Sequence, residues 1–273
     1  MAPGPGPGPG PERPVGLGAA LFARYAYPPS ALGYCGPAGA PTLFASAREP
    51  GWEEDVGRAA AGFEGAWPYL ELIAEANGIA DPLEADVVEA YFVGGPLLER
   101  VPEEGAVARL ARGFAAETAG FGAVTGALPR GGLLHHSFHV LFVYPWLRMA
   151  RAGVLEPSLR ILDRCRIRSG TVLSVEGESV VVKSERLRLE DGELAIGGEQ
   201  VEVVSRSLDG SGPLLELAAG DEVSLHWDRI CDRLDRERAG WLRDCTSRNI
   251  AVANAGLRRS RVEPEQRRSG GAT

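Results

Sequence analysis

The stretch GTVLSVEGESVVVKSERLRLEDGELAIGGEQVEVVSRSL, residues 170–208, decides the fold of the second half of the chain. β-Branched residues alternate with polar ones, and Glu-Gly, Asp-Gly and Gly-Gly pairs separate the runs, which is typical of antiparallel strands joined by tight turns. Several short strands connected in this way predict a small closed barrel. GDEVSLHWDRICDRLD, residues 220–235, continues the pattern, so we expect the barrel to occupy residues 159–235.

A helical pattern precedes and follows the predicted barrel. Between residues 15 and 158, apolar side chains recur at spacings of three and four, as at Phe63, Trp67 and Leu70, which is typical of amphipathic helices. The same period returns at residues 236–258. The sequence therefore predicts an α+β protein with an N-terminal α-helical domain, an OB-like β-barrel and a C-terminal helix.

Both ends of the chain are expected to be disordered. Residues 1–14 are a Pro/Gly repeat that can bury no apolar face, and residues 259–273 are rich in charged residues and glycine. Pro28 and Pro29 are expected to end the first helix, because proline lacks the amide proton that a helix interior requires.

Composition limits the possible classes of function. The chain of 273 residues has a net charge of −8, which argues against a nucleic-acid-binding protein, since such a protein needs a basic face. No apolar run approaches the roughly 18 residues that cross a membrane, and no secretory signal is recognisable. We therefore expect a cytoplasmic protein with no nucleic-acid or membrane partner, whose four cysteines are free thiols.

Cys165 and His226 form the first candidate site. Cys165 precedes the first predicted strand and His226 lies on the last, and closure of a barrel brings its first and last strands together. A thiolate and an imidazole suit iron or zinc. Arg164, Arg166 and Arg168 are expected to lower the pKa of the thiol, so we expect an exposed sulfur that faces His226 across the barrel rim. The alternative is a small apolar filler beside a hydrogen-bonded histidine.

The segments CRIRSGTVLSVEG and GDEVSLHWDRICDRLD also carry a family resemblance. A cysteine, a glycine five residues later, a G-x-V-x-x-V strand and a closing Gly-Asp-x-Val-x-x-His segment resemble the HypC/HupF family of nickel-iron hydrogenase maturation chaperones. The matching positions are Cys165, Gly170, Val172, Val175, Gly220, Asp221, Val223, His226, Ile230, Leu234 and Asp235.

The resemblance implies a HypC-like barrel and a non-enzymatic role in hydrogenase maturation. In that family the cysteine and the histidine carry an Fe(CN)2(CO) unit, roles that fall on Cys165 and His226. The implied cargo is iron as a dicyano-carbonyl unit, and the implied partners are the hydrogenase large-subunit precursor and other maturation proteins. The family's cysteine is N-terminal, whereas Cys165 is internal, and Ser169 replaces the family's proline. The whole chain also looks like an uncharacterised actinobacterial family associated with hydrogenase gene clusters.

A second candidate site combines Cys35 with the histidines of LLHHSFHV, residues 133–140. In a helix, His135 and His139 lie on one face, as do His136 and His139. Either pair could chelate a transition metal with Cys35 as a third ligand, so we expect these side chains to lie close together. This site would suit a metal-dependent or cysteine enzyme. A structural polar cluster, in a purely structural interaction module, is the other alternative.

Overall fold

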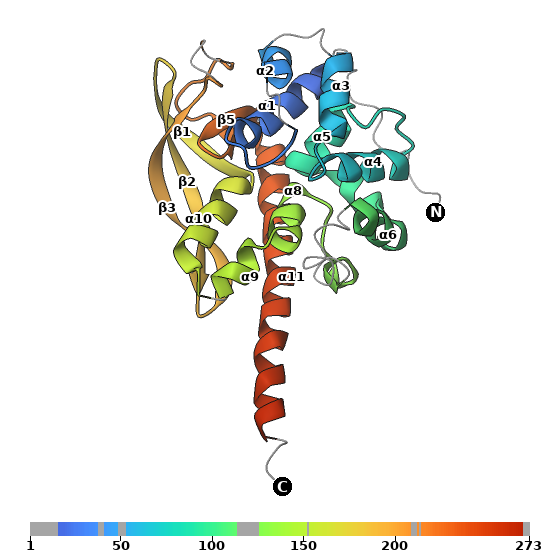
Figure 1. Ribbon diagram of the computed structural model, residues 1–273. Coiled ribbons are helices and arrows are strands. Elements are labelled where there is room, and N and C mark those ends of the chain that lie inside the picture. Colours follow the sequence, from blue (N-terminus) through green and yellow to red (C-terminus); the bar gives the residue numbers. More distant parts are fainter. Residues whose placement is uncertain are drawn as a thin grey trace, which may run out of the picture.

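The computed structural model of the protein describes residues 16–37, 41–48, 53–113, 126–151, 153–208, 212 and 214–269. It confirms the predicted α+β class, with helices, a closed five-stranded barrel and a long C-terminal helix. In Figure 1 the barrel lies on the left, most of the helices lie on the right, and α11 runs between them. Within the described ranges, no helix has both the length and the apolar character needed to span a bilayer.

The N-terminal part consists of short helices that share one hydrophobic core. In chain order they are α1 (Leu17–Ala31), α2 (Pro41–Arg48), α3 (Glu53–Ala61), α4 (Trp67–Ala76), α5 (Ala85–Phe92), η1 (Pro96–Arg100), α6 (Glu103–Gly113), η3 (Leu128–Arg130), α8 (His136–Phe138), η4 (His139–Val143), α9 (Trp146–Arg151) and α10 (Leu155–Cys165). The largest fully buried side chains of this core are aromatic, namely Phe22, Tyr25, Tyr69, Tyr91 and Phe138.

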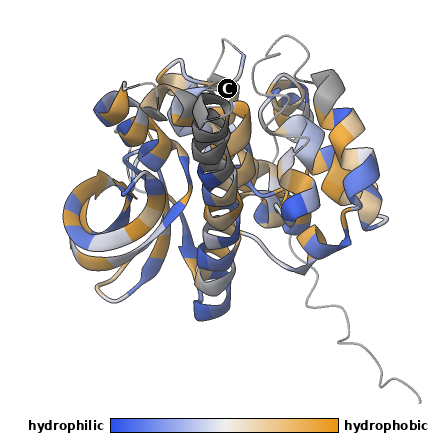
Figure 2. Ribbon diagram, turned by 90° about the horizontal axis from the view of Figure 1, so that it is seen from below, coloured by the Kyte–Doolittle hydropathy of each residue, from blue (hydrophilic) through white to orange (hydrophobic). Residues whose placement is uncertain are grey.

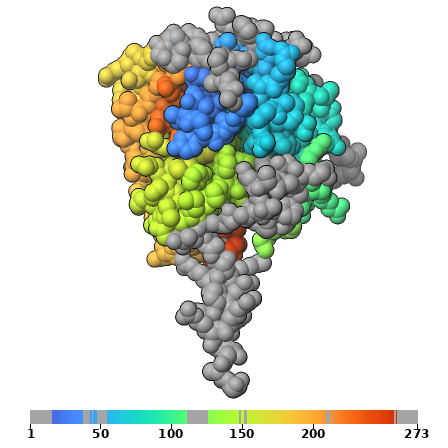
Figure 3. All heavy atoms as spheres, in the orientation of Figure 1, coloured from blue at the N-terminus to red at the C-terminus, as the bar shows by residue number. Residues whose placement is uncertain are grey.

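Helix α1 passes through Pro28 and Pro29, so the expectation that these prolines end it is wrong. Proline has no N–H group, and Pro29 therefore cannot donate to the carbonyl of Tyr25, four residues earlier. This carbonyl accepts a hydrogen bond from outside the helix instead, from Nδ1 of His226 at 2.7 Å. Pro29 thus leaves the carbonyl oxygen of Tyr25 free to accept a hydrogen bond from the barrel. In Figure 3 the blue surface of α1 lies between the yellow and orange barrel and the cyan helices that follow.

The barrel contains β1 (Arg168–Glu176), β2 (Ser179–Glu190), β3 (Glu193–Ser205), β4 (Glu222–His226) and β5 (Arg229–Leu234). The strand order is β1-β2-β3-β5-β4, and β4 closes the barrel by pairing antiparallel with β1. The ring of strands is visible from below in Figure 2. The strand that meets β1 is therefore the fourth, and His226 ends that strand instead of lying on the last one as expected.

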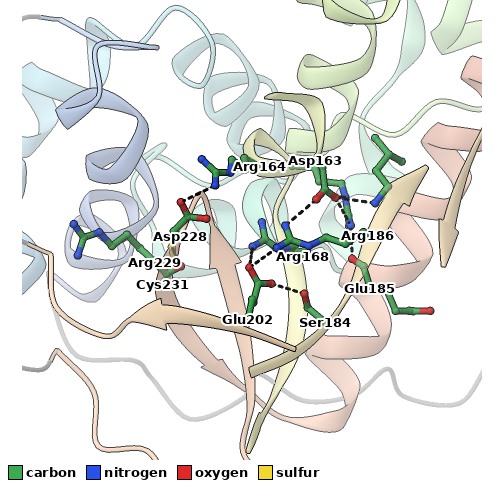
Figure 4. Close-up of polar contacts among 12 residues, drawn as sticks. Asp163, Arg164, Arg168, Ser184, Glu185, Arg186, Glu202, Asp228, Arg229 and Cys231 are labelled. Carbon is green, nitrogen blue, oxygen red and sulfur yellow. Dashed lines mark hydrogen bonds and ion pairs between the residues drawn. The ribbon is translucent and has the colours of Figure 1, made fainter. Parts of the chain in front are cut away.

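Apolar side chains fill the middle of the barrel, and an ionic cluster closes one end of it. The apolar layer is made of Val172, Val180, Val182, Val204, Val223, Leu225 and Ile230. The ionic cluster consists of Asp163, Arg166, Arg168, Arg186 and Glu202 (Figure 4). Since Asp163 belongs to α10 and the others follow it on or beside β1, β2 and β3, the cluster joins this helix to three strands.

Asp163 is the central acceptor of the ionic cluster. It accepts hydrogen bonds from Arg166 at 2.8 Å, from Arg186 at 2.9 Å and from the backbone N–H of Leu187 at 2.8 Å. Burial alone would raise the pKa of this carboxyl, but Arg166, Arg168 and the hydrogen bonds outweigh burial and hold the pKa below its usual value. The end of α10 is therefore fixed against the barrel by a charged group that must stay ionised.

The boundaries between the parts differ from the expected ones. The helices continue to Cys165 instead of ending near residue 158, and the first strand begins at Arg168. Helix α11 (Arg236–Ser269) continues beyond the expected end at residue 258, so the tail predicted to be disordered at 259–273 is helical as far as Ser269. The N-terminal tail, residues 1–14, lies outside the described residues.

Two asparagines of α11 bind backbone on both sides of this helix. Asn254 accepts from the N–H of Leu194 and donates to its carbonyl, both at 2.8 Å. Asn249 makes the equivalent pair with Leu133, at 2.9 and 3.1 Å. Because Leu194 belongs to β3 and Leu133 precedes α8, α11 connects the barrel to the helical part.

Replacing Asp163 by Asn should lower the free energy of unfolding by about 3–5 kcal/mol, because the buried guanidinium of Arg166 and the partly buried one of Arg186 lose their carboxylate. Denaturant titration near neutral pH measures this loss. A carboxyl with a lowered pKa stabilises the fold above its unfolded pKa of about 3.9, and this contribution is lost as pH falls through the folded value. The difference between the two proteins should therefore shrink below about pH 4.

Glu199→Gln is the matched control for this substitution. Glu199 forms a 2.9 Å ion pair with Lys183, but both side chains are exposed. Its removal should change the free energy of unfolding by less than about 0.5 kcal/mol. Equal effects of the two substitutions would contradict the structural role given to Asp163.

Candidate functional site

Three buried side chains converge where the barrel meets the helical part: His136, Cys165 and His226. One potential ligand atom from each lies within 4.8 Å of the other two. They come from α8, from the last residue of α10 and from the last residue of β4. Within the described ranges, no other three His, Cys, Asp or Glu side chains are gathered in this way. We refer to these residues as the His136–Cys165–His226 triad.

A backbone hydrogen bond places Cys165 beside His226. The N–H of Trp227 donates to the carbonyl of Arg164 at 2.8 Å. Arg164 precedes Cys165, and Trp227 follows His226, so the bond joins the immediate neighbours of the two candidate ligands. Trp227 has a φ of 55°, a left-handed conformation that is uncommon for a residue other than glycine. The turn after β4 is therefore shaped so that its N–H reaches the carbonyl end of α10.

His226 is oriented as a metal-ligating histidine would be. Its Nδ1 lies 2.7 Å from the carbonyl oxygen of Tyr25, so Nδ1 carries the proton and donates it. The Nε2 atom is buried and makes no contact that meets hydrogen-bond geometry among the described residues, although the backbone of Cys165 lies close enough to the ring to raise its pKa. Burial and then the nearby His136 lower the pKa of His226 to about 3, so the ring is neutral. A ring held by a carbonyl at one nitrogen, with a lone pair at the other, is typical of metal ligands.

His136 is oriented by Tyr91. The Tyr91 hydroxyl donates to the carbonyl of Gly65 at 2.5 Å, because a carbonyl can only accept. The same hydroxyl oxygen lies 3.1 Å from Nδ1 of His136, and it accepts the Nδ1 proton in one of the two tautomers of the neutral ring. Burial lowers the pKa of His136 to about 4, so the ring is neutral, and in this tautomer the lone pair lies on Nε2. The two triad rings are 5.1 Å apart between centroids.

The contact between His136 and Cys165 contains a conflict. Nε2 of His136 lies 3.0 Å from the carbonyl oxygen of Cys165. With the Nδ1 proton given to Tyr91, a lone pair of nitrogen faces a lone pair of oxygen. If the ring proton lies on Nε2 instead, it satisfies the Cys165 carbonyl, but Nδ1 then faces the Tyr91 oxygen without a proton between them. Three contacts (Gly65 to Tyr91, Tyr91 to His136 and His136 to Cys165) have only two protons, one from the Tyr91 hydroxyl and one from the neutral ring. A cation at Nε2 would remove this repulsion.

Cys165 is buried, which corrects the expectation of an exposed sulfur. The residue is 6% exposed and ends α10. Burial and then the neighbouring Cys35 raise the pKa of the Cys165 thiol, instead of lowering it as expected. The helix turns this side chain inward, toward His226.

The flanking arginines do not hold a thiolate, because each has another partner. Arg164 pairs with Asp228 on the surface at 3.4 Å. Arg166 and Arg168 are bound within the ionic cluster, at 2.8 Å from Asp163 and Glu202 respectively. The thiol therefore stays neutral.

His135 and His139 lie outside the triad. His135 donates from Nε2 to the carbonyl of Phe92 at 3.0 Å, and its Nδ1 accepts from the N–H of Ser137 at 3.1 Å, which caps α8. His139 contacts the Tyr69 hydroxyl at 3.3 Å. Burial lowers the pKa of both rings to about 3. Within the part of the chain that the structure describes, these two histidines form no metal-ligating group with Cys35.

Cys35 lies on the loop after α1 and packs against the hydrophobic core that contains Cys165. It is half-buried, and burial raises its pKa to about 12. It also contributes to the raised pKa values of Cys165 and Tyr91. The grouping of Cys35 with His135, His136 and His139 as one metal site therefore stays a prediction, and the triad that the structure does gather shares His136 with it.

The triad offers two neutral imidazole nitrogens and one thiol. Such a soft and borderline donor set suits zinc, iron or copper better than calcium or magnesium. Metal–nitrogen bonds of about 2.0–2.1 Å and metal–sulfur bonds of about 2.3 Å place donors roughly 3–4 Å apart. The donors of the triad are close enough to reach these separations by small side-chain movements.

Sequence reasoning did not join His136 to Cys165 and His226, and it missed Tyr25 and Tyr91. One local signal existed for Tyr25, because Pro29 stands four residues after it and frees its carbonyl. No local pattern marks Tyr91, whose role depends on how α5 packs against α8.

Comparison with known proteins identifies the family of the chain. A model of a family of unknown function, DUF6390, matches residues 14–260. The chain therefore belongs to this family, which confirms the expectation of an uncharacterised family but supplies no activity. No curated protein and no solved structure matches the chain.

Anaerobic titration with Co²⁺ or Zn²⁺ should reveal one site per chain that depends on the triad. Cys165→Ala and His226→Gln should each weaken binding by at least about 100-fold, because each removes a ligand. Cys245→Ala and His139→Gln remove a buried cysteine and a buried histidine outside the triad, and both should bind normally. Equal losses in all four variants would contradict the assignment.

Tyr91→Phe should weaken metal binding by about 10–100-fold, since it removes the acceptor that orients His136. The aromatic ring remains, so the fold should persist, and circular dichroism checks this. Tyr69→Phe is the control, because the Tyr69 hydroxyl contacts His139 instead of a triad residue. An unchanged affinity in Tyr91→Phe would show that Tyr91 does not position the ligand.

Proposed function

We propose that this member of a family of unknown function is a metal-carrying accessory protein of nickel-iron hydrogenase maturation. The observation that carries the proposal is the His136–Cys165–His226 triad, in which the buried Nε2 of His226 makes no contact that meets hydrogen-bond geometry among the described residues. Buried polar atoms in native proteins are nearly always paired. An unpaired imidazole nitrogen beside a thiol and a second imidazole is therefore best explained by a metal ligand.

The hydrogenase assignment rests on the residue pattern together with the fold. Segments that resemble HypC/HupF form strands of a closed barrel, and the two residues that match the cargo ligands, Cys165 and His226, lie together. The comparisons with known proteins add no support for this similarity. The proposed cargo is iron as a dicyano-carbonyl unit, received from other maturation proteins and delivered to the large-subunit precursor in the cytoplasm.

His136 gives the site a donor that the internal cysteine lacks. An N-terminal cysteine has a free amine beside its thiol, whereas Cys165 is followed and preceded by peptide bonds. The imidazole of His136 places a nitrogen beside the same residue, 3.0 Å from its carbonyl oxygen. The helical part of the chain would thus contribute directly to holding the cargo.

A carrier explains the chemistry of the site better than a cysteine enzyme does. The attacking species in cysteine enzymes is the thiolate, and such sites lower the thiol pKa. Burial raises the pKa of both Cys165 and Cys35. A thiol of this kind is a poor nucleophile, but it can still bind a metal ion, because metal binding displaces its proton.

Anaerobic purification from hydrogenase-producing cells tests the proposal. The protein should retain iron and show infrared bands in the cyanide and carbonyl stretching regions, and Cys165→Ala should lose both. In cells that lack the wild-type gene, Cys165→Ala should fail to restore hydrogenase activity, whereas Cys245→Ala should restore it. Normal hydrogenase activity with Cys165→Ala would reject the proposed function.

A further inference from the structure

Strand β3 has one edge that no other described strand covers along most of its length. On one side β3 pairs with β2 from Glu193 to Ser205, whereas on the other side it pairs with β5 only at Ser205. Figure 1 shows β3 on the outer side of the barrel. An edge of this kind presents backbone N–H and C=O groups to its surroundings and is a template for pairing with another strand.

The backbone groups of Val201 and Val203 point to this open edge. In an antiparallel pair of strands, the N–H and C=O groups of alternate residues point to the same side. The N–H of Ser205 points away from β2, because it donates to the carbonyl of Asp228 at 3.1 Å. Val203 and Val201 are the alternate residues before Ser205, so their N–H and C=O groups also point away from β2.

Both ends of this edge are occupied by other parts of the chain. Ser205 binds the β5 side at one end, and Asn254 of α11 binds the N–H and C=O groups of Leu194 at the other, both at 2.8 Å. Gly198 has no partner on β2, and this bulge shifts the alternation by one residue, so that Leu194 faces the same edge as Val201. The open part of the edge is therefore residues 199–203.

The side chains of the open edge are apolar. Val201 and Val203 are 65% and 66% exposed, more than any other large apolar side chain among the described residues. Val181 of β2 lies opposite Val203 and extends the apolar stripe. Natural proteins usually protect such edges with charged residues, prolines or a covering element. The edge thus combines unpaired backbone groups with an apolar face, which are the two features that a second strand would bind.

The charges along the edge favour an antiparallel copy of the same edge. At one end, the exposed side chains of Glu199 and Glu185 lie directly opposite each other, and Lys183 pairs with Glu199 at 2.9 Å. Like charges in this position repel, and one lysine compensates only one of them. At the other end, Arg229 lies opposite Ser205 and forms no ion pair within the described part of the chain. Antiparallel pairing would bring the acidic end of each copy to the basic end of the other.

We propose that two copies of this chain associate by antiparallel pairing of β3 along residues 199–203, about a twofold axis at Glu202. In this register Val201 of each copy lies opposite Val203 of the other, and each of these two pairs exchanges two backbone hydrogen bonds. The four valines form one apolar patch on the outer face of the joined barrels. The same surface is used by both copies, as a twofold dimer requires. The inference does not depend on the proposed metal site.

Sedimentation equilibrium tests the association. The wild-type protein should reach twice the mass of one chain as its concentration rises. In the double variant Val201→Lys/Val203→Lys the dissociation constant should rise by about tenfold or more, because lysines then face each other in both pairs. Val154→Lys changes a valine that is 44% exposed and lies outside β3, so this control should dimerise as the wild type does. A monomeric wild type, or an unchanged dissociation constant in the double variant, would overturn the inference.

Hydrogen exchange locates the interface. Peptides that cover residues 199–204 should exchange more slowly in concentrated than in dilute wild-type protein, because the dimer adds hydrogen bonds to the N–H groups of Val201 and Val203. Peptides from β5 should exchange equally at both concentrations, and circular dichroism should show the same fold in every variant. A dimer without this protection uses another surface and contradicts the proposal. Failure of the metal site leaves these results unchanged, because no variant alters the triad.

Discussion

The carbonyl oxygen of Tyr25 joins the helical part of the chain to the chemistry of the barrel. Pro29 cannot donate to it, and the 2.7 Å hydrogen bond from His226 sets both the orientation and the tautomer of this ring. If α1 did not pack against β4, the Tyr25 carbonyl and the Nδ1–H of His226 would lose each other as hydrogen-bond partners, and leaving either one buried and unpaired costs about 1–3 kcal/mol. The hydroxyl of Tyr25 repeats the link, 2.7 Å from Oγ of Ser224. The candidate site therefore exists only when both parts of the chain are packed together.

Charge is distributed so that the site itself stays neutral. Asp163 and Glu202 pair with Arg166 and Arg168, two of the three arginines near Cys165 in sequence, and these pairs attach α10 to the barrel. What remains at the triad is a thiol and two neutral imidazoles, which are far less costly to bury than ions. A divalent cation would bring its own charge and convert the thiol to thiolate. The same arginines thus build the fold around the cysteine without tuning its reactivity.

The barrel could be predicted because its signals are local. Alternation and turn residues within 170–208 are enough to place strands and hairpins, and closure then brings Cys165 near His226 even though the fourth strand closes the ring. Burial of Cys165 could not be predicted, since sequence neighbours such as Arg166 can point away from it. The direction of the last turn of α10 decides this, and that direction depends on Glu202 and Asp163. His136 enters the site through the docking of α8, for which no local pattern exists.

The proton count around His136 is an argument for the proposed metal ligand. Between the carbonyls of Gly65 and Cys165, Tyr91 and His136 make three contacts with two protons. A third proton would satisfy all three, but burial holds the pKa of His136 at about 4, so the proton is absent at neutral pH. Packing of α5 and α8 maintains these three contacts. A soft cation accepts the Nε2 lone pair without requiring a proton, and it can also bind the sulfur of Cys165 and the unpaired nitrogen of His226. The three side chains are therefore better matched to a metal ion than to protonation.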